Sequence, residues 1–144
     1  MKVREILKEK GSRVVTVTPH STVHDLARRM KLEGIGAAVV SRDGLQVDGI
    51  VSESEIVRSL AERGARLLDR PVSDIMLKSV VTCTAEDSVK EVAQRMTRHR
   101  VRHLPVIEDG KLAGIVSIGD VVKSRLDEME LEANVLRDYI VAHQ

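Results

Sequence analysis

The chain has 144 residues, of which 42% are apolar and 31% charged, and its formal net charge is +1. This length suits one compact folded unit with little left over, and the balanced, mixed charge gives no support to a DNA-binding or membrane-binding protein. The sequence contains one tyrosine and no tryptophan or phenylalanine, so it lacks the rings on which single-stranded nucleic acids stack.

The first half of the sequence predicts a strand, a helix, a strand, a hairpin, a strand and a helix. Residues 14–18 (VVTVT) form a β-branched run typical of a strand. Thr18 followed by Pro19 predicts a helix start directly after it. The later elements of this half are apolar residues at helical spacing from Val23 to Met30, a buried strand over 35–40, a turn at Asp43-Gly44 and a helix from Ser52.

The same order of elements returns 66 residues later. VVTCT at 80–84 repeats VVTVT at 14–18, and GIVS at 114–117 repeats GIVS at 49–52 at an offset of 65, so the second hairpin is one residue shorter. The second half therefore predicts a strand over 80–84, a helix start at Thr84, helical spacing from Val89 to Met96, a strand over 101–107, a turn at Asp109-Gly110 and a helix from Ser117.

Each half is about 60 residues long and buries only a marginal core by itself, so the two halves are predicted to pack together about a pseudo-twofold axis. The predicted fold class is α/β (α+β), with two β-α-β-β-α repeats and an extended C-terminal helix. The predicted units are residues 1–66, 67–126 and 127–144, the last being the helical extension. Clefts in the interface of such a pair are the expected place for a ligand.

The junction GIVSIGD at 114–120 sets Ser117 and Asp120 three residues apart, where a strand ends and a helix begins. A hydroxyl and a carboxylate in this position could hold a ribose diol, with nearby amides free for phosphate. The same spacing is close to a capping box, in which both side chains serve only the helix end. Spacing by itself leaves both interpretations open.

A basic cluster interrupts the apolar strand VRHLPV at 101–106. Neighbours on a strand point to opposite faces, so at least one of Arg102 and His103 leaves the core or meets an anion. Residues 98–100 directly upstream are also basic. The cluster predicts either a phosphate site, for which arginine supplies a fork of donors, or a solvated basic turn.

These motifs, together with VSDIM at 72–76, resemble the cystathionine-β-synthase (CBS) domain pair, or Bateman module. The resemblance runs from Val3 to about Leu126 and is strongest to the small stand-alone bacterial CBS-pair proteins related to the regulatory part of IMP dehydrogenase. It implies a non-catalytic regulatory module that binds an adenine nucleotide (AMP, ADP, ATP or NAD(H)) and carries no catalytic cofactor.

The resemblance also implies which residues bind the nucleotide. They are Lys78, Ser79, Val80 and Val101 around the adenine, Arg102 and His103 near the phosphates, and Ser117 and Asp120 at the ribose. A weaker second site is expected at the corresponding residues of the first repeat, which are Val14, Gly36, Ala37, Ser52 and Glu55. There, Glu55 replaces the aspartate that the family prefers, and Ser52-x-x-Glu55 is the better capping box. We therefore expect the second repeat to bind more tightly.

The C-terminal segment has apolar residues at spacings of 4, 3, 4, 3 and 4, a heptad-like seam. They are Val122, Leu126, Met129, Ala133, Leu136 and Ile140. The predicted helix, from about Gly119 to Ala142, is longer than a CBS domain needs. It packs either on its own domain or, as we prefer, against a partner subunit, and the resemblance independently implies a homodimer in which two pairs form a flat disc.

Other functions stay open beside the nucleotide sensor. One is a ligand-independent interaction scaffold; another is an RNA- or DNA-binding module using the arginines between 95 and 102, which the lack of aromatic rings disfavours. His20 and His24 have metal spacing, but no third ligand is evident and no metal is predicted. No apolar run approaches the ~20 residues of a membrane span, and Cys83 permits no internal disulfide, so a cytoplasmic protein with an unidentified regulated partner is predicted.

Overall fold

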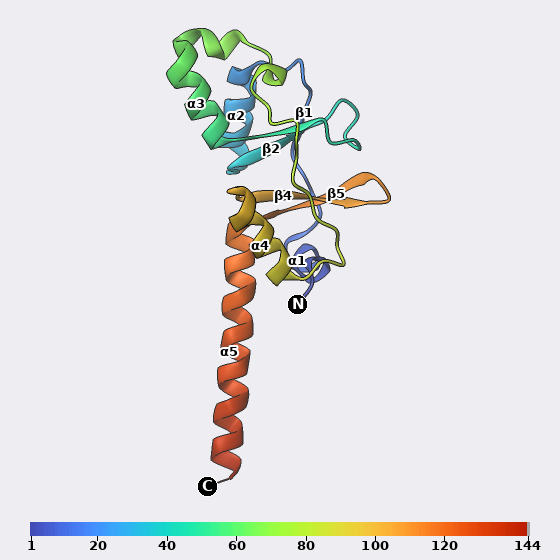
Figure 1. The fold of residues 1–144 in the computed structure, drawn as a ribbon, viewed down its shortest axis with the longest axis vertical. Coiled ribbons are helices and arrows are strands. Elements are labelled where there is room, and N and C mark those ends of the chain that lie inside the picture. Colours follow the sequence, from blue (N-terminus) through green and yellow to red (C-terminus); the bar gives the residue numbers. More distant parts are fainter. Residues whose placement is uncertain (144) are drawn as a thin grey trace.

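Two mixed α/β units account for most of the computed structural model, which describes residues 1–143, and a long helix leads away from them (Figure 1). This arrangement confirms the predicted fold class. The first repeat contains β1 (Thr16–Val17), α2 (Val23–Glu33), β2 (Ala37–Val40), β3 (Gly49–Ser52) and α3 (Glu53–Arg63). The second contains α4 (Val89–His99), β4 (His103–Glu108), β5 (Lys111–Ser117) and α5 (Ile118–Ala142). The remaining elements are α1 (Val3–Lys10) and two 3₁₀ helices, η1 (Gly64–Asp69) and η2 (Val72–Asp74).

The sheets of the two repeats differ by one strand. In the first repeat β2 lies between a parallel β1 and an antiparallel β3. The strand predicted for 80–84 is wrong, because the second repeat keeps only an isolated bridge between Cys83 and Val106. At the matching position of β2 the Val39 N–H donates to the carbonyl just before β1 over 3.3 Å. Pro105 stands there in β4 and has no N–H to donate, so the ladder cannot extend.

Both predicted helix starts are wrong by four residues. Helices α2 and α4 begin after Thr22 and Ser88, and not after Thr18 and Thr84. The hydroxyls of Thr22 and Ser88 each accept a hydrogen bond from the N–H three residues further on, over 3.1 and 3.0 Å, which is N-cap geometry. Thr18 and Thr84 instead open tight turns that precede the caps.

The two predicted turns have different outcomes. Asp109 and Gly110 have φ values of 51° and 74°, as a two-residue type I′ turn requires, and they connect β4 to β5 as predicted. In the first repeat, Asp43 lies within a wider loop over 41–48. Its side chain accepts from the N–H of Leu45 over 2.9 Å. The carboxylate therefore stabilises a wider loop, and no tight hairpin forms here.

The hydrophobic cores of the repeats exchange their leading segments. Val3 and Ile6 of α1 pack in the core of the second repeat, where Figure 1 shows α1 beside α4 and β5. Val72 and Ile75, which have the same spacing and come before the second repeat, pack in the core of the first. The V-x-x-I segment before the first repeat therefore completes the core of the second repeat, and the one before the second repeat completes the core of the first.

Close approach of these segments explains two glycines. A Cβ on Gly49 would lie 2.6 Å from the sulfur of Met76, and a Cβ on Gly114 would lie 2.8 Å from a methyl group of Leu7. A side chain at either position would have to displace the Met76 or the Leu7 side chain. The glycine that opens each GIVS strand thus admits the segment exchanged from the other repeat.

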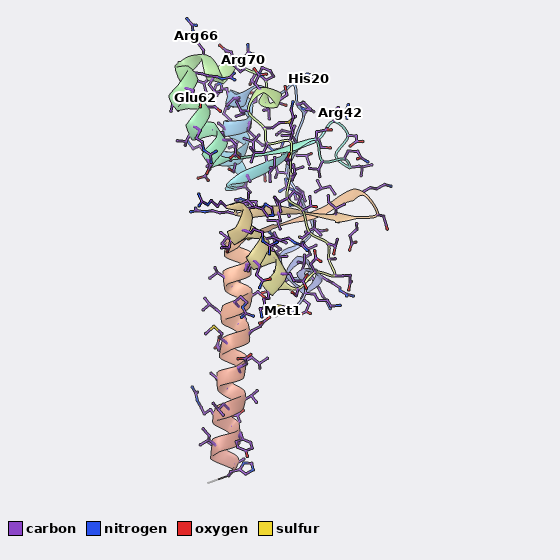
Figure 2. All side chains as sticks on the ribbon, in the orientation of Figure 1. Met1, His20, Arg42, Glu62, Arg66 and Arg70 are labelled. Atoms are coloured by element: carbon purple, nitrogen blue, oxygen red, sulfur yellow. The ribbon has the colours of Figure 1, made fainter. Side chains whose placement is uncertain are left out.

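Helix α5 extends 25 residues from the end of β5, in agreement with the predicted C-terminal extension. Among its residues only Val121 and Ser124 are buried, and the side chains of its distal part stand clear of the two repeats (Figure 2). No helix within residues 1–143 combines the length and the apolar character that a membrane span requires.

Candidate ligand site between the repeats

A cleft of about 800 Å³ opens where the two repeats meet. It is lined from both repeats, since strand ends and helix starts of each one face it. It brings together part of the predicted second-repeat site, namely Val101, Arg102, His103 and Ser117, and part of the weaker set, namely Gly36, Ser52 and Glu55. Residues that the sequence assigned to two separate sites therefore line one cleft.

The remaining predicted site residues do not line this cleft. Leu77, the residue just before three of them, does line the cleft. It pairs with Ile50 at the edge of β3 through hydrogen bonds of 2.9 and 3.0 Å. The segment that follows Leu77 continues past the rim, where two of its side chains are exposed. The predicted residues outside the cleft are Val14, Ala37, Lys78, Ser79, Val80 and Asp120.

Equivalent backbone hydrogen bonds fix the strand–helix junctions of the two repeats against the neighbouring strands. The Glu53 N–H donates to the Gly36 carbonyl over 3.1 Å, and the Ile118 N–H donates to the Arg102 carbonyl over 2.8 Å. Each bond ties the first residue of a helix, α3 or α5, to the start of the neighbouring strand. The first turns of both helices therefore border the cleft.

Ser117 and Asp120 form a reciprocal capping box. The Asp120 N–H donates to the Ser117 hydroxyl over 3.1 Å, and the Ser117 N–H donates to Asp120 Oδ2 over 2.8 Å. The same Oδ2 lies 2.7 Å from the ammonium group of Lys10 on α1. Asp120 borders a smaller hollow of about 240 Å³ beside α1 and is not among the residues that line the main cleft.

The environment of Asp120 favours its charged form. Burial opposes ionisation, but the ammonium group of Lys10 and the Ser117 N–H outweigh it and hold the pKa of Asp120 below its ordinary value. Lys10 was not predicted as a site residue, because α1 reaches Asp120 only through the exchange of segments between the cores. No local sequence pattern could have indicated that pairing.

The matching pair in the first repeat is arranged differently. Both the N–H and the hydroxyl of Ser52 donate to Glu55 Oε1, each over 2.7 Å. Glu55 is only 7% exposed. Its carboxylate is thus held by its own helix start, the arrangement expected for a helix cap.

Positive charge predominates on the cleft walls. Three arginines, from α3, from the end of α4 and from the residue before β4, outnumber the two acids, Glu53 and Glu55. Sequence analysis had not identified Arg58, although it lies four residues after Ser54 on the face of α3 that borders the cleft. The basic residues of the cleft are Arg58, His99, Arg100, Arg102 and His103.

Arg100 lies in the cleft wall with an unusual backbone conformation. It caps the C-terminus of α4 in the left-handed region, with φ 55° and ψ 42°. The equivalent cap of α2 is Gly34, with φ 66° and ψ 38°, and glycine is the residue that adopts this conformation without strain. The second repeat thus carries a strained arginine where the first has glycine, and such strain is typical of functional positions.

His103 faces the first repeat across the cleft. A Cβ built on Gly36 would lie 3.5 Å from the His103 ring and 3.2 Å from a carboxylate oxygen of Glu53, so these three residues meet at one point. Burial lowers the pKa of His103 below its ordinary value. Among the nearby charges, Glu53 and Asp120 act in the opposite direction, while Lys10 and Arg102 lower the pKa further.

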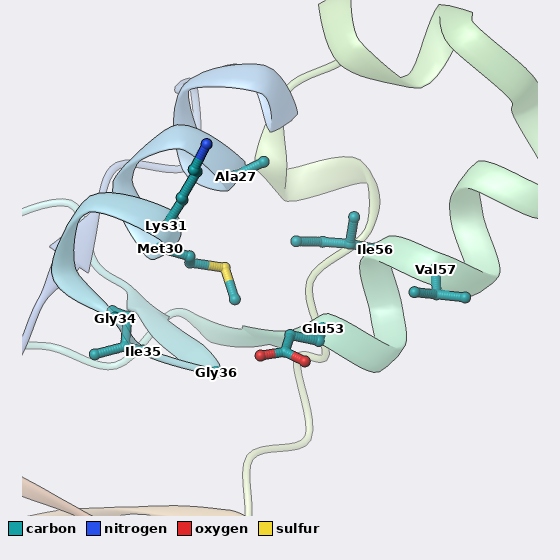
Figure 3. Close-up of a pocket in the computed structure, with 9 residues that line it drawn as sticks. All are labelled: Ala27, Met30, Lys31, Gly34, Ile35, Gly36, Glu53, Ile56 and Val57. Atoms are coloured by element: carbon teal, nitrogen blue, oxygen red, sulfur yellow. The ribbon is translucent and has the colours of Figure 1, made fainter.

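A second hollow of about 530 Å³ lies within the first repeat, between α2 and α3 (Figure 3). Aliphatic side chains of Met30, Ile35 and Ile56 form its walls, and Glu53 stands at the end nearest the main cleft. Gly36 is the one predicted site residue that borders it. Apart from Lys31 and Glu53 its lining is apolar or glycine, so it offers a nucleotide fewer phosphate and ribose partners than the main cleft.

The remaining candidates are a metal site and the single cysteine, Cys83. Within residues 1–143, no three His, Cys, Asp or Glu side chains lie close enough together to hold a metal ion. Cys83 is 2% exposed in the core of the second repeat, and burial raises the pKa of its thiol to about 12. Cys83 is thus a small core residue.

Comparison with known families gives two matches to the CBS domain model, over residues 3–62 and 72–127. The mitochondrial CBS domain-containing protein CBSX3 of Arabidopsis thaliana is 34% identical over 96% of this chain and 71% of its own length. The CBS domain-containing protein YhcV of Bacillus subtilis is 30% identical over 80% of this chain and 81% of its own.

Solved structures show the same architecture. The CBS-domain protein ATU1752 from Agrobacterium tumefaciens superimposes with a TM-score of 0.84 at 43% identity, over 87% of this chain and 99% of that one. The CBS domain pair of protein MJ0100, solved with 5′-methylthioadenosine and S-adenosyl-L-methionine, has a TM-score of 0.76 at 23% identity, over 90% of this chain and 98% of that one. At that identity the likeness to MJ0100 establishes the fold alone.

Proposed function

The chain belongs to the CBS-domain family, and from this premise we propose that it is a regulatory module that senses an adenine nucleotide. The nucleotide is AMP, ADP, ATP or NAD(H), and it binds in the cleft between the two repeats. The module performs no chemistry itself; a cytoplasmic partner protein reads its ligand state.

The observation that carries this proposal is the positive charge gathered where the repeats meet. Arg58 comes from the first repeat, while Arg100 and Arg102 come from the second, and all three border one cleft. Arginine presents a planar fork of donors that matches phosphate oxygens. The strained backbone of Arg100 is retained at this wall, which supports a role in holding an anion.

The ribose and the adenine bind on either side of these arginines. Asp120 does not line the cleft, but Ser117 and Gly119 beside it do, so a ribose at this end of the cleft comes close to Asp120. Its Oδ2 is used by Ser117 and Lys10, and within residues 1–143 its Oδ1 makes no hydrogen bond, so this oxygen is assigned to a ribose hydroxyl. Ser117 presents the hydroxyl end of the same junction to the cleft. The adenine extends from Val101, which lines the cleft, toward the rim, where the predicted segment Lys78, Ser79 and Val80 is proposed to cover it.

The related fold of MJ0100 supports the class of ligand. Its CBS pair binds 5′-methylthioadenosine and S-adenosyl-L-methionine, both of which contain an adenosine group. The ribose and adenine contacts proposed for this chain suit that group, and its arginines suit added phosphates. An adenine nucleotide is thus the ligand whose parts the cleft residues match.

Signalling requires that the nucleotide bind one arrangement of the repeats more tightly than another. His103 of the second repeat and Glu53 of the first meet at Gly36, so a phosphate placed between the repeats alters the contact that joins them. We propose that this change is passed to a homodimer of two CBS pairs. The partner protein then responds to the altered dimer.

Calorimetric titration of ligand-stripped protein with AMP, ATP and NADH tests the proposal. We expect saturable binding of at least one of the three, because the cleft combines phosphate and ribose partners in one space. GMP serves as the control, since it has the same phosphate and ribose as AMP but a different base. Absence of heat with all three adenine nucleotides would contradict the sensor function.

The complete capping box favours one second candidate, a ligand-independent interaction scaffold. In that case the Ser117 and Asp120 side chains serve only the first turn of α5, as their reciprocal bonds allow. The scaffold requires no nucleotide, so the same titration separates it from the sensor.

Nucleotide affinity is expected to rise as pH falls below about 6.5, the ordinary pKa of histidine. Burial lowers the pKa of His103 in the free protein, so the folded state favours the neutral ring, and stability declines as pH falls through this range. A phosphate beside the ring favours the charged form, so binding takes up a proton.

The pH dependence is measured by titrating AMP at several pH values in buffers of different ionisation enthalpy. His103→Gln is the control, since it removes the titrating ring while the protonation of AMP itself is unchanged. We expect the variant to lose the extra proton uptake. Equal proton uptake by both proteins would place the phosphate away from His103.

A further inference from the structure

Helix α5 has an exposed apolar face that the rest of residues 1–143 leaves uncovered. Its six seam residues, Val122 to Ile140 at heptad spacing, are all exposed, and the five larger ones have exposed fractions from 49% for Val122 to 60% for Met129 and Leu136. Helices in proteins owe most of their stability to the packing of an apolar face. The distal part of α5 has no such packing within the chain, as Figure 2 shows.

The spacing of the seam assigns heptad positions along the helix. Leu126, Ala133 and Ile140 occupy the a positions, while Val122, Met129 and Leu136 occupy the d positions. The flanking e and g positions, which set the partner and orientation of a coiled coil, carry charges of both signs. They are Lys123, Glu130 and Arg137 at e, and Arg125, Glu132 and Tyr139 at g.

A parallel pair of these helices in register brings opposite charges together. In that arrangement a g residue meets the e residue five positions later on the partner. Arg125 then faces Glu130 of the partner, and Glu132 faces Arg137 of the partner. Twofold symmetry repeats both pairs, which gives four attractive contacts. Arg125 lies 3.0 Å from Glu128 of its own helix, an exposed contact that leaves its donors available for sharing.

An antiparallel pair with the same seam brings like charges together. It would place Leu136 opposite Leu126, so that e residues face e residues and g residues face g residues. Glu130 then meets its own copy, Glu132 meets its own copy, and Lys123 meets Arg137. Like charges in such positions are destabilising, so the charge pattern selects the parallel orientation.

We propose that α5 pairs with α5 of a second copy of this chain as a parallel, in-register coiled coil. The seam spans about 28 Å at 1.5 Å per residue, which is short for an isolated coiled coil. The proposal therefore rests on the homodimer proposed above, with the two α5 helices side by side in it, which raises their effective concentration. It does not depend on the nucleotide.

Disulfide trapping of the full chain tests the orientation. In a Leu136→Cys variant, the new thiol faces its own copy in the same layer of a parallel pair. In the antiparallel pair the two copies would lie about 15 Å apart along the axis, the rise of ten residues. Mild oxidation should therefore convert Leu136→Cys to a linked dimer. The native Cys83 contributes no background, because it is buried in the core.

Val135→Cys is the matched control, since residue 135 is equally exposed in the single chain but lies outside the seam. We expect Leu136→Cys to link several-fold faster than Val135→Cys. Equal rates, or linkage that requires mixing Leu126→Cys with Leu136→Cys chains, would overturn the parallel coil. Light scattering on the same samples separates the two proposals, because a dimer that persists without linkage at position 136 keeps the homodimer and refutes the coil.

Discussion

An Asp120→Ala variant is expected to bind AMP about 10- to 150-fold more weakly than the wild-type protein, because a hydrogen bond to a charged group contributes about 1.5–3 kcal/mol. The carboxylate lies beside Ser117 at the first turn of α5, and its Oδ1 is the oxygen proposed to accept from the ribose. The measurement is the calorimetric titration described above, made on both proteins at one pH and salt concentration.

Glu55→Ala provides the matched control for loss of a helix cap. Both variants lose a carboxylate that accepts from the N–H of a cap residue, and each is expected to lose about 0.5–2 kcal/mol of unfolding free energy. Glu55 borders the cleft, but its carboxylate is held by Ser52 and no ribose contact is assigned to it, so we expect its replacement to cause no loss of AMP affinity. If Asp120→Ala loses stability by this amount but binds AMP with wild-type affinity, Asp120 is only a cap.

An Ile6→Ala variant is expected to lose about 2–5 kcal/mol of unfolding free energy, the usual cost of truncating a buried isoleucine. Position in sequence assigns Ile6 to the beginning of the first repeat, but the side chain packs in the core of the second. The truncation should therefore loosen the second repeat. Denaturant unfolding measures the loss, and the rate at which a thiol reagent modifies Cys83 reports on that core.

Lys8→Ala, on the same helix, is the control for changes in α1 itself. Lys8 is exposed, so its replacement should change stability by no more than about 0.5 kcal/mol. We expect faster modification of Cys83 in Ile6→Ala than in Lys8→Ala. Similar stability and similar modification rates in the two variants would show that α1 does not belong to the second core.

Periodicity and internal repetition were sufficient to predict the fold class. The apolar residues of α2 and α4 follow helical spacing, and the Asp109-Gly110 turn has the backbone its sequence indicates. The errors came from competing local signals. A threonine before proline suggested a helix start at Thr18, although Thr22 with Asp25 three residues later is the pattern that forms the cap.

Pairing between distant segments was beyond sequence reasoning. Pro105 was visible in VRHLPV, but its effect depends on which carbonyl its missing N–H would have faced. The exchange of Val3 and Val72 between cores likewise leaves no periodic signal, since both segments read as ordinary apolar starts. As a consequence Lys10, the partner of Asp120, could not be identified from the sequence.

The candidate site was predicted in part. Arg102, His103 and Ser117 border the cleft, and both motifs that carry them, the basic strand and the strand–helix junction, were recognised in the sequence. Arg58 was missed because it reaches the cleft only through the packing of the two repeats against each other, which the sequence pattern does not specify. The nucleotide-binding assignments of all these residues stay predictions until ligand binding is measured.

Helix α5 begins at Ser117, a residue of the cleft, and ends far from both repeats. Its 25 residues make a rod about 37 Å long at 1.5 Å per residue. A tilt of about 10° at Ser117 would therefore move the far end by about 6 Å, as follows from that length. Any reorientation of α5 at its N-terminus would therefore be larger at its C-terminal end than at the cleft.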